Sequence, residues 1–269
     1  MTPPFPPFDP DEPPARRRLR QLPQVPLRRI VPSLVTLLAL CAGLTSIRLS
    51  IEKRFDVAIA AIALAVFLDG IDGRVARLLR ATSRFGAELD SLTDFVNFGV
   101  APAILLFVWA LGDFGSLGWI AALIYAICCA LRLARFNVAI DSTAKPEWPA
   151  DFFVGVPAPA GAVTVLLPVY AEFVGAPHGS WTAAVTFLYT LAIGFLMVSR
   201  LPTWSGKLVG RRIAREWVLP VFVGMVLAVA LLVAYPWQVA TVAALAYLVT
   251  LPLSWRAFRR RYSKTGKPR

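Results

Sequence analysis

The sequence predicts an all-α, polytopic integral membrane protein with about eight transmembrane helices. Hydrophobic residues make up 57% of its 269 residues, and the mean hydropathy is +0.64. Apolar runs long enough to cross roughly 30 Å of hydrocarbon recur along most of the chain. Basic residues gather in alternate connections between these runs, which is typical of membrane proteins with a defined orientation. A soluble apolar core explains this pattern poorly.

The start of the chain differs in composition from the rest. Residues 1–29 contain nine prolines and six arginines and show no apolar period. Such a segment buries too little apolar surface to fold, so we expect a disordered cytoplasmic arm. It contains no apolar signal-peptide core before Ile30. Its arginines could contact anionic lipid headgroups.

Eight apolar segments follow the arm, each long enough for a helix across the membrane. The division between the last two is open, because Pro236 and its aromatic neighbours could form either a turn or a kink within one segment over 216–255. The expected spans are 30–51, 56–79, 87–112, 116–139, 155–175, 181–199, 216–234 and 237–255.

The distribution of Lys and Arg predicts that both termini are cytoplasmic. Of 28 basic residues, all but Arg48, Lys53 and Arg54 fall on one side of the predicted bundle. An excess of Lys and Arg marks the cytoplasmic side. We therefore expect three parts: the arm, a transmembrane domain over 30–255, and a basic cytoplasmic tail over 256–269.

Charge and cysteine content exclude other classes. The net charge is +12, but the basic residues lie between apolar spans and not on one soluble face, so no nucleic-acid partner is expected. All three cysteines, Cys41, Cys128 and Cys129, lie within apolar runs and are expected to pack as thiols. The single histidine, His178, is expected to be a solvated loop residue.

One stretch, "FLDGIDGRVARLLRATSRFGAELDSLTDF", places carboxylates inside two adjacent spans. Asp69 and Asp72 are three residues apart near the end of the second span, and Asp90 and Asp94 are four apart near the start of the third. These spacings put each pair on one helix face. Because the two spans are antiparallel, the four carboxylates can converge just below the cytoplasmic interface. Glu88 lies off this face.

Converging carboxylates at that depth require compensation. Each ionised group costs several kcal/mol in the membrane, and four together repel one another. Hard divalent cations prefer oxygen ligands, and two such ions about 4 Å apart form a clamp for in-line attack at phosphorus. Gly73, Ala76 and Gly86 would open space beside the acids for a base or phosphate, and Arg77 offers a bidentate fork for phosphate oxygens.

The spacing of these residues resembles a known signature. Asp69, Asp72, Gly73, Ala76, Arg77, Gly86, Asp90 and Asp94 match, without a departure, the D-x-x-D-G-x-x-A-R-x8-G-x-x-x-D-x-x-x-D pattern of the CDP-alcohol phosphatidyltransferases. The resemblance implies a membrane enzyme in which an alcohol displaces CMP from a CDP-activated lipid at a site with two divalent ions, Mg2+ or Mn2+.

The resemblance also implies roles for individual residues. Asp69, Asp72 and Asp90 would ligate metal, while Asp94 would contact the second ion and act as the general base. The CDP-lipid would be held by Gly73, Ala76, Arg77 and Gly86, together with Ser83. The family's Pro-Asn-x-x-Thr segment here reads "PSLVT", so Ser33 replaces the usual Asn.

Later segments resemble the phosphatidylserine synthase branch of this family. They are "NFGVAPA", "CALRLARFN", "GVPAPAGA" and "LMVSRLPTWSGK". This resemblance implies CDP-diacylglycerol and L-serine as substrates and a homodimer. The predicted topology puts the active site near the cytoplasmic face, and because no eukaryotic targeting feature appears we expect a bacterial inner membrane. Serine carries a carboxylate, so its pocket should offer basic and polar groups near the metals. The candidates are Asn97, Arg132, Arg135, Asn137 and Arg200, with Arg200 preferred because it begins a short turn.

Other functions remain open at this stage. The acidic motif does not separate serine from glycerol 3-phosphate, an inositol phosphate or choline as the acceptor. Phosphorylated acceptors need a denser basic cluster, and choline favours an aromatic or acidic cage. A cation-coupled transporter is a weaker alternative, since transporters usually bind at the bilayer midplane between inverted repeats. A scaffold protein would leave the carboxylates without compensation.

Overall fold

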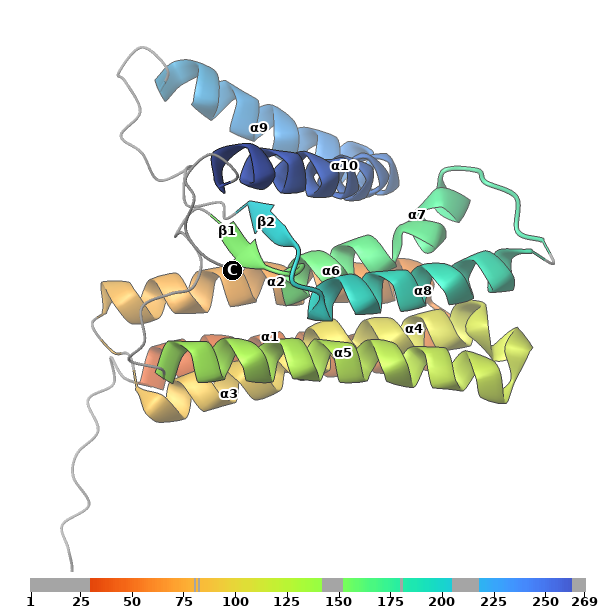
Figure 1. Ribbon diagram of the computed structural model, residues 1–269, viewed down its shortest axis with the longest axis horizontal. Coiled ribbons are helices and arrows are strands. Elements are labelled where there is room, and N and C mark those ends of the chain that lie inside the picture. Colours follow the sequence, from red (N-terminus) through yellow and green to blue (C-terminus); the bar gives the residue numbers. More distant parts are fainter. Residues whose placement is uncertain are drawn as a thin grey trace, which may run out of the picture.

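The computed structural model describes residues 30–79, 81, 83–141, 152–179, 181–204 and 218–262. Within these residues the chain forms a bundle of long helices lying roughly side by side, with one short two-stranded sheet (Figure 1). The expected N-terminal arm and the last residues of the expected tail lie outside the described residues.

Each predicted span corresponds to a helix or to a short series of helices. The first four correspond to α1 (Ile30–Ile51), α2 (Phe55–Leu78), the series α3 (Arg84–Asp94), η2 (Phe95–Val100) and α4 (Ala101–Trp109), and α5 (Ser116–Asp141), which follows the short helix η3 (Leu111–Phe114). The others correspond to the pair α6 (Ala158–Val165) and α7 (Leu167–Phe173), then α8 (Thr182–Val198), α9 (Val218–Ala234) and α10 (Pro236–Tyr262).

The apolar helices indicate an integral membrane protein. Within the described part of the chain, four segments have the length and composition to cross a membrane: 30–51, 84–109, 116–139 and 236–260. Three shorter apolar segments cover 158–173, 182–198 and 218–234. The second predicted span, α2, is interrupted by the charged residues of the acidic motif, which lower its hydropathy. Its embedded carboxylates are therefore the feature that needs a functional explanation.

Small residues let α1 pack closely on its neighbours. The buried face of α1 includes Ala39, Ala42, Gly43 and Ser46, and α1 lies against α2, α3 and α4. α2 and α3 approach one another less closely than either approaches α1. The first helix thus serves as the common support, and space remains between the two helices that carry the acids.

A proline interrupts the third span directly after the acidic motif. Pro102 has no N–H, so the Phe98 carbonyl loses its usual helical donor. The Tyr125 hydroxyl of α5 donates to this carbonyl instead, at 3.0 Å. Between Asp94 and Pro102 the backbone forms the π-helical turn η2, a form that accommodates such interruptions within helices.

A proline also interrupts the fifth span, and a tyrosine hydroxyl again donates to the carbonyl that it leaves free. Pro168 lies in the first turn of α7 and cannot donate to the Thr164 carbonyl. The Tyr189 hydroxyl of α8 donates to that carbonyl at 2.7 Å. A tyrosine from the adjacent helix therefore satisfies the freed carbonyl at each break, which ties α5 to η2 and α8 to α6.

A small sheet joins two connections on the side of the bundle where α10 lies. β1 (Phe152–Val154) pairs antiparallel with β2 (Pro202–Trp204), with Phe153 opposite Thr203. Gly155 follows β1 with φ +75° and donates its N–H to the Leu201 carbonyl at 2.8 Å. Only glycine adopts that backbone without strain.

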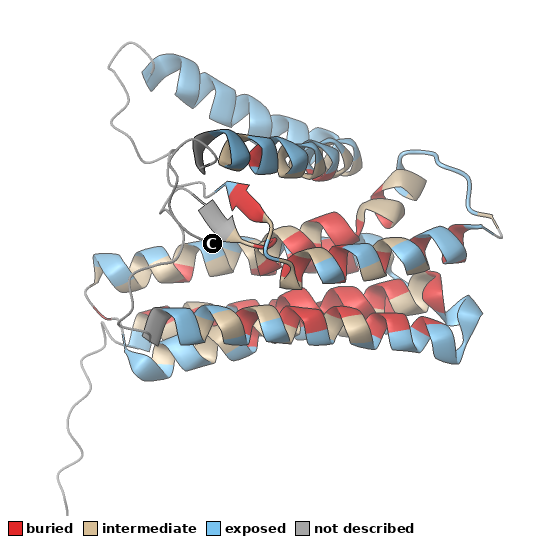
Figure 2. Cartoon of the chain, in the orientation of Figure 1, coloured by how far each residue is buried: buried red, intermediate tan, exposed pale blue. Residues whose placement is uncertain are grey.

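The last apolar segment, 216–255, is divided into two helices at Pro236. α9 ends at Ala234 and α10 begins at Pro236, so they are two helices and not one kinked segment. α10 packs against α6, α7 and β2, whereas α9 is exposed along its described length (Figure 2). A helix that is apolar all round and exposed fits a lipid environment. α10 extends through Tyr262, into the predicted tail.

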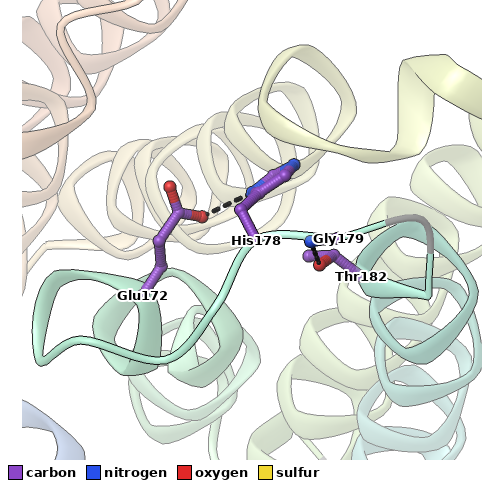
Figure 3. A network of polar contacts seen from close by, with 4 residues as sticks. All are labelled: Glu172, His178, Gly179 and Thr182. Atoms are coloured by element: carbon purple, nitrogen blue, oxygen red, sulfur yellow. Dashed lines mark hydrogen bonds and ion pairs between the residues drawn. The ribbon is translucent and has the colours of Figure 1, made fainter.

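His178 is exposed, as predicted, but it is not without partners. Its Nδ1 lies 2.7 Å from Glu172 Oε2, and the nearby Gly179 N–H donates to the Thr182 hydroxyl (Figure 3). The imidazole ring also meets the Trp109 ring edge to face at 5.5 Å. These contacts connect the end of α4 with α7 and the loop before α8.

We expect Tyr125→Phe to lower the stability of the bundle by about 1 to 3 kcal/mol, because it leaves the buried Phe98 carbonyl without a donor. Thermal unfolding in detergent would measure this effect. Tyr235→Phe is the matched control, since Tyr235 is 56% exposed. Equal melting temperatures for the two variants would contradict the structural role of the Tyr125 hydroxyl.

Candidate active site

The predicted carboxylates converge in the structure. Asp69, Asp72 and Asp90 each present an oxygen within 4.8 Å of those of the other two. Asp94 lies outside that group but approaches Asp69 closely enough for a hydrogen bond between their carboxyl groups. Glu88 is exposed, as predicted. The spacings of three and four residues on two facing helices therefore brought together the side chains that the sequence indicated.

Part of the cluster is sheltered from water, while Asp69 and Asp90 are half-buried. Asp72 is 6% exposed, and one carboxylate oxygen of Asp94, Oδ1, is buried with no hydrogen-bond partner in the described structure. Among the described residues no ion pair joins these carboxylates to an Arg or Lys. Buried carboxylates without ion-pair partners are costly, so a bound cation would stabilise the cluster.

A divalent metal ion fits this donor set. Three carboxylate oxygens from two helices lie within 4.8 Å of one another, and all three are hard oxygen donors of the kind that such an ion prefers. Neutral groups nearby can hold the ligands in place. The Thr36 hydroxyl of α1 donates to Asp72 Oδ2 at 2.8 Å and also lies 3.1 Å from the Pro32 carbonyl oxygen. Sequence reasoning missed this bond, although it named the segment Pro32–Thr36.

A cavity of about 190 Å³ opens beside the carboxylates. All five residues predicted to hold the CDP-lipid line it, and Ser33 also lines it despite the departure from the usual Asn. The remaining lining residues include two of the acids, Asp72 and Asp90. The full lining is Pro32, Ser33, Thr36, Asp72, Gly73, Ala76, Arg77, Ala81, Ser83, Gly86, Ala87 and Asp90.

Local backbone structure shapes two sides of this cavity. Ser83 caps the start of α3, and its hydroxyl accepts a hydrogen bond from the Gly86 N–H at 3.0 Å. A Cβ at Gly86 would lie 3.1 Å from that hydroxyl, and a Cβ at Gly73 would enter open space. Gly86 therefore keeps the cap compact, while Gly73 leaves room inside the cavity. Arg77 is exposed at the rim.

Asn97 follows Asp94 on η2 and is fully buried. Neither its amide oxygen nor its amide nitrogen has a hydrogen-bond partner in the described chain. It presses against Gly43 of α1, where an added Cβ would overlap the Asn97 amide oxygen and lie 3.3 Å from its Cα. Gly43 is thus needed for the close approach of η2 to α1.

Three of the residues predicted to bind the acceptor are Arg135, Asn137 and Arg200. Their surroundings differ from those of Arg132. Arg135 donates to the backbone carbonyls at the end of α8, with the shortest bond, 2.8 Å, to Val198. The Asn137 amide donates to the Ser91 hydroxyl at 2.9 Å. Arg200, the preferred candidate, is exposed and has the like charge of Arg135 nearby.

Arg132 is the candidate whose surroundings point to the cluster. It lies close enough to Asp94, Cys129 and Tyr247 to interact electrostatically. Its Nε is buried and has no hydrogen-bond partner among the described residues. The ring of Phe136 lies 5.9 Å from its guanidinium carbon. Nothing in the sequence distinguished Arg132 from Arg135, because their partners come from distant parts of the chain.

Comparison with known proteins supports the resemblance found in the sequence. The model of the CDP-alcohol phosphatidyltransferase family matches residues 29–255. Three similar proteins are named CDP-diacylglycerol--serine O-phosphatidyltransferase. The one from Mycobacterium leprae is 50% identical over 65% of this chain and 58% of its own length. Those from Mycobacterium bovis and Helicobacter pylori are 40% and 32% identical, over 86% and 84% of this chain and 80% and 91% of their own lengths.

The contact between Gly43 and Asn97 gives a test of the site's packing. We expect Gly43→Ala to lower stability by about 1 to 3 kcal/mol, because the added methyl group overpacks the interface between α1 and η2. Gly70→Ala is the control, since a Cβ at Gly70 meets nothing within 4 Å. Thermal unfolding of both variants measures the difference, and a harmless Gly43→Ala would show that η2 can shift away from α1.

Proposed function

Because this chain belongs to the CDP-alcohol phosphatidyltransferase family, we propose that it transfers the phosphatidyl group of CDP-diacylglycerol to the hydroxyl of L-serine. The products are phosphatidylserine and CMP. The relatives' names support serine as the acceptor. The observation that carries the proposal is the convergence of three Asp carboxylates beside a cavity lined by the CDP-lipid residues of the signature.

Two divalent ions, Mg2+ or Mn2+, complete the site in this proposal. Asp69, Asp72 and Asp90 would hold them, and Asp94 would contact the second ion. When bound, such ions neutralise charge on the diphosphate, acidify the acceptor hydroxyl and stabilise the departing CMP. The Thr36 hydroxyl restrains the Asp72 carboxylate, which reduces the reorganisation that metal binding requires.

The CDP-lipid binds in the cavity between α2 and α3. Gly73, Ala76 and Gly86 let the nucleotide approach the backbone, and Ser83 adds a hydroxyl at the start of α3. Arg77 at the rim offers its guanidinium to phosphate oxygens. The diacylglycerol part extends between helices into the membrane, which explains why the enzyme is embedded.

Asp94 acts as the general base. It accepts the proton of the serine hydroxyl while the hydroxyl oxygen attacks the phosphatidyl phosphorus. The bond between that phosphorus and the CMP oxygen breaks, and the proton remains on the Asp94 carboxyl group. No His or Cys side chain lies in the signature 69–94, so a carboxylate is the available base.

The acceptor carboxylate binds on the side of Asp94 away from the cavity. Of the five candidates, Arg132 has the strongest support, because it is near Asp94 and lacks a hydrogen-bond partner for Nε. Asn97 remains a candidate through its unpartnered buried amide. Arg135 and Asn137 already bond to other groups, and Arg200 is exposed, so their support is weaker.

The same proposal covers topology and assembly. Eight spans over 30–255 form the catalytic domain, and the arm 1–29 and tail 256–269 face the cytoplasm. Basic connections on one side support this orientation. It puts the active site near the cytoplasmic face of a bacterial inner membrane. A homodimer follows from the family resemblance.

The acceptor is tested by supplying purified protein in detergent micelles with CDP-diacylglycerol and each acceptor separately. We expect CMP release and phosphatidylserine only with L-serine, loss of both on adding EDTA, and recovery with Mg2+ or Mn2+. Formation of phosphatidylglycerol phosphate from glycerol 3-phosphate, without phosphatidylserine, would overturn the choice of acceptor. CMP release that persists in EDTA would overturn the metal requirement.

Replacement of the proposed base gives a second test. We expect Asp94→Asn to reduce kcat by about 10²-fold or more, because an amide cannot accept the hydroxyl proton. Glu88→Gln is the control, since Glu88 is exposed on the same helix, and it should retain wild-type turnover. The assignment of Asp94 is wrong if Asp94→Asn turns over at the wild-type rate.

A further inference from the structure

Two buried polar groups, one on α5 and one on α10, lie within electrostatic range of one another, and the group on α5 is also within range of the proposed base. The Nε of Arg132 on α5 and the hydroxyl of Tyr247 on α10 are both buried, and neither has a hydrogen-bond partner in the described structure. The two side chains are close enough to interact electrostatically, and Arg132 has the same relation to Asp94. Buried donors without acceptors each cost roughly 1 to 3 kcal/mol, so such an arrangement is expected where a ligand supplies the acceptor.

The packing of α5 against the third span brings Arg132 to the level of Asp94. On one side of that level, Asn137 bonds to Ser91 at 2.9 Å. On the other side, a Cβ at Gly99 would lie 3.2 Å from the Cβ of Cys129. Asp94 and Arg132 fall between these two contacts on antiparallel helices, and their proximity therefore follows from the helix register.

The position of Tyr247 follows from the packed face of α10. Ala244 is fully buried, and Tyr247, Leu248 and Leu251 pack against the hydrophobic core. Tyr247 lies on the same face as these apolar residues, at spacings of three and four. The Tyr247 ring is thus held by packing, while its hydroxyl remains available as a donor.

We propose that Tyr247 and Arg132 together bind the carboxylate of the acceptor, which makes α10 a determinant of acceptor specificity. This inference rests on the proposed function, in which the acceptor is L-serine. A guanidinium and a phenol hydroxyl both donate to a carboxylate, and the bond from arginine is charge-assisted. Only one carbon separates the carboxylate of serine from its hydroxymethyl group, so a carboxylate held at Arg132 keeps the hydroxyl near Asp94.

The surroundings of the other basic candidates favour this pair. Arg135 is engaged by carbonyls at the end of α8, and Arg200 is exposed. An acceptor without a carboxylate, such as choline, would leave Arg132 and Tyr247 unsatisfied, which gives a physical basis for discrimination. Arg132 and Tyr247 would therefore select for an anionic group next to a primary hydroxyl.

Tyr247→Phe tests the inference, because it removes only the hydroxyl and keeps the packed ring. We expect the KM for L-serine to rise about tenfold, as for loss of one hydrogen bond to a charged group. The KM for CDP-diacylglycerol should change less than about twofold. Arg132→Lys should raise the KM for serine further, because lysine lacks the planar fork. Tyr235→Phe and Arg48→Lys, both exposed, are the matched controls.

L-Serinamide distinguishes a role in binding the carboxylate from a merely structural role. It keeps the hydroxyl and ammonium groups of serine but lacks the carboxylate, so a merely structural change would leave the preference for serine over serinamide unaltered. Wild type should prefer serine to serinamide in kcat/KM, and both variants should lose most of that preference. Thermal unfolding in detergent establishes whether each variant is folded, and the preference of the folded variant decides the question.

The outcomes separate this inference from the proposed function. Wild type that makes phosphatidylserine, with variants that keep both the serine KM and the preference over serinamide, overturns the role of Tyr247 and Arg132 alone. A lower kcat with unchanged KM and preference in both variants also overturns it. Wild type that uses a different acceptor and not serine overturns the proposed function and this inference together.

Discussion

The cost of carboxylates inside a membrane is the constraint on which the structure depends. Asp72 is almost fully buried, and Asp69 and Asp90 converge on it from two helices. A protein gains nothing in stability from this arrangement unless a cation is bound. The helices that carry the acids therefore need support that does not depend on attraction between them. α1 provides that support, because its small residues let it pack against both.

Breaks in the helices locate the catalytic machinery. η2 follows directly after Asp94, where Pro102 removes a backbone donor, and Tyr125 from α5 restores the missing hydrogen bond. This bond ties the proposed base to the helix that carries Arg132. Irregular backbone within a membrane is tolerated where protein surrounds it and satisfies its polar groups. Here the bond from Tyr125 also fixes how η2, next to the proposed base, lies against α5.

Much of the candidate site was predictable because its residues are close in sequence. The acids and the five CDP-lipid residues lie within a helix, a short loop and the next helix. Spacing alone indicated that each pair of acids shares a helix face, and the family resemblance indicated the CDP-lipid residues. Arg132 and Arg135 show the limit of this reasoning. They are three residues apart on α5, yet one donates to the end of α8 and the other lies beside Asp94.

Hydropathy and charge by themselves determined a helical membrane protein, the extents of its apolar segments and the motif that carries the acids, because these depend on local composition and helical period. Tertiary structure alone decided that Pro236 separates two helices, that Thr36 donates to Asp72, and that Tyr247 lies within electrostatic range of Arg132. Each of these depends on which helices pack together and at what register. The pattern of a single sequence does not predict this packing and register, because the residues that contact one another are far apart in the chain.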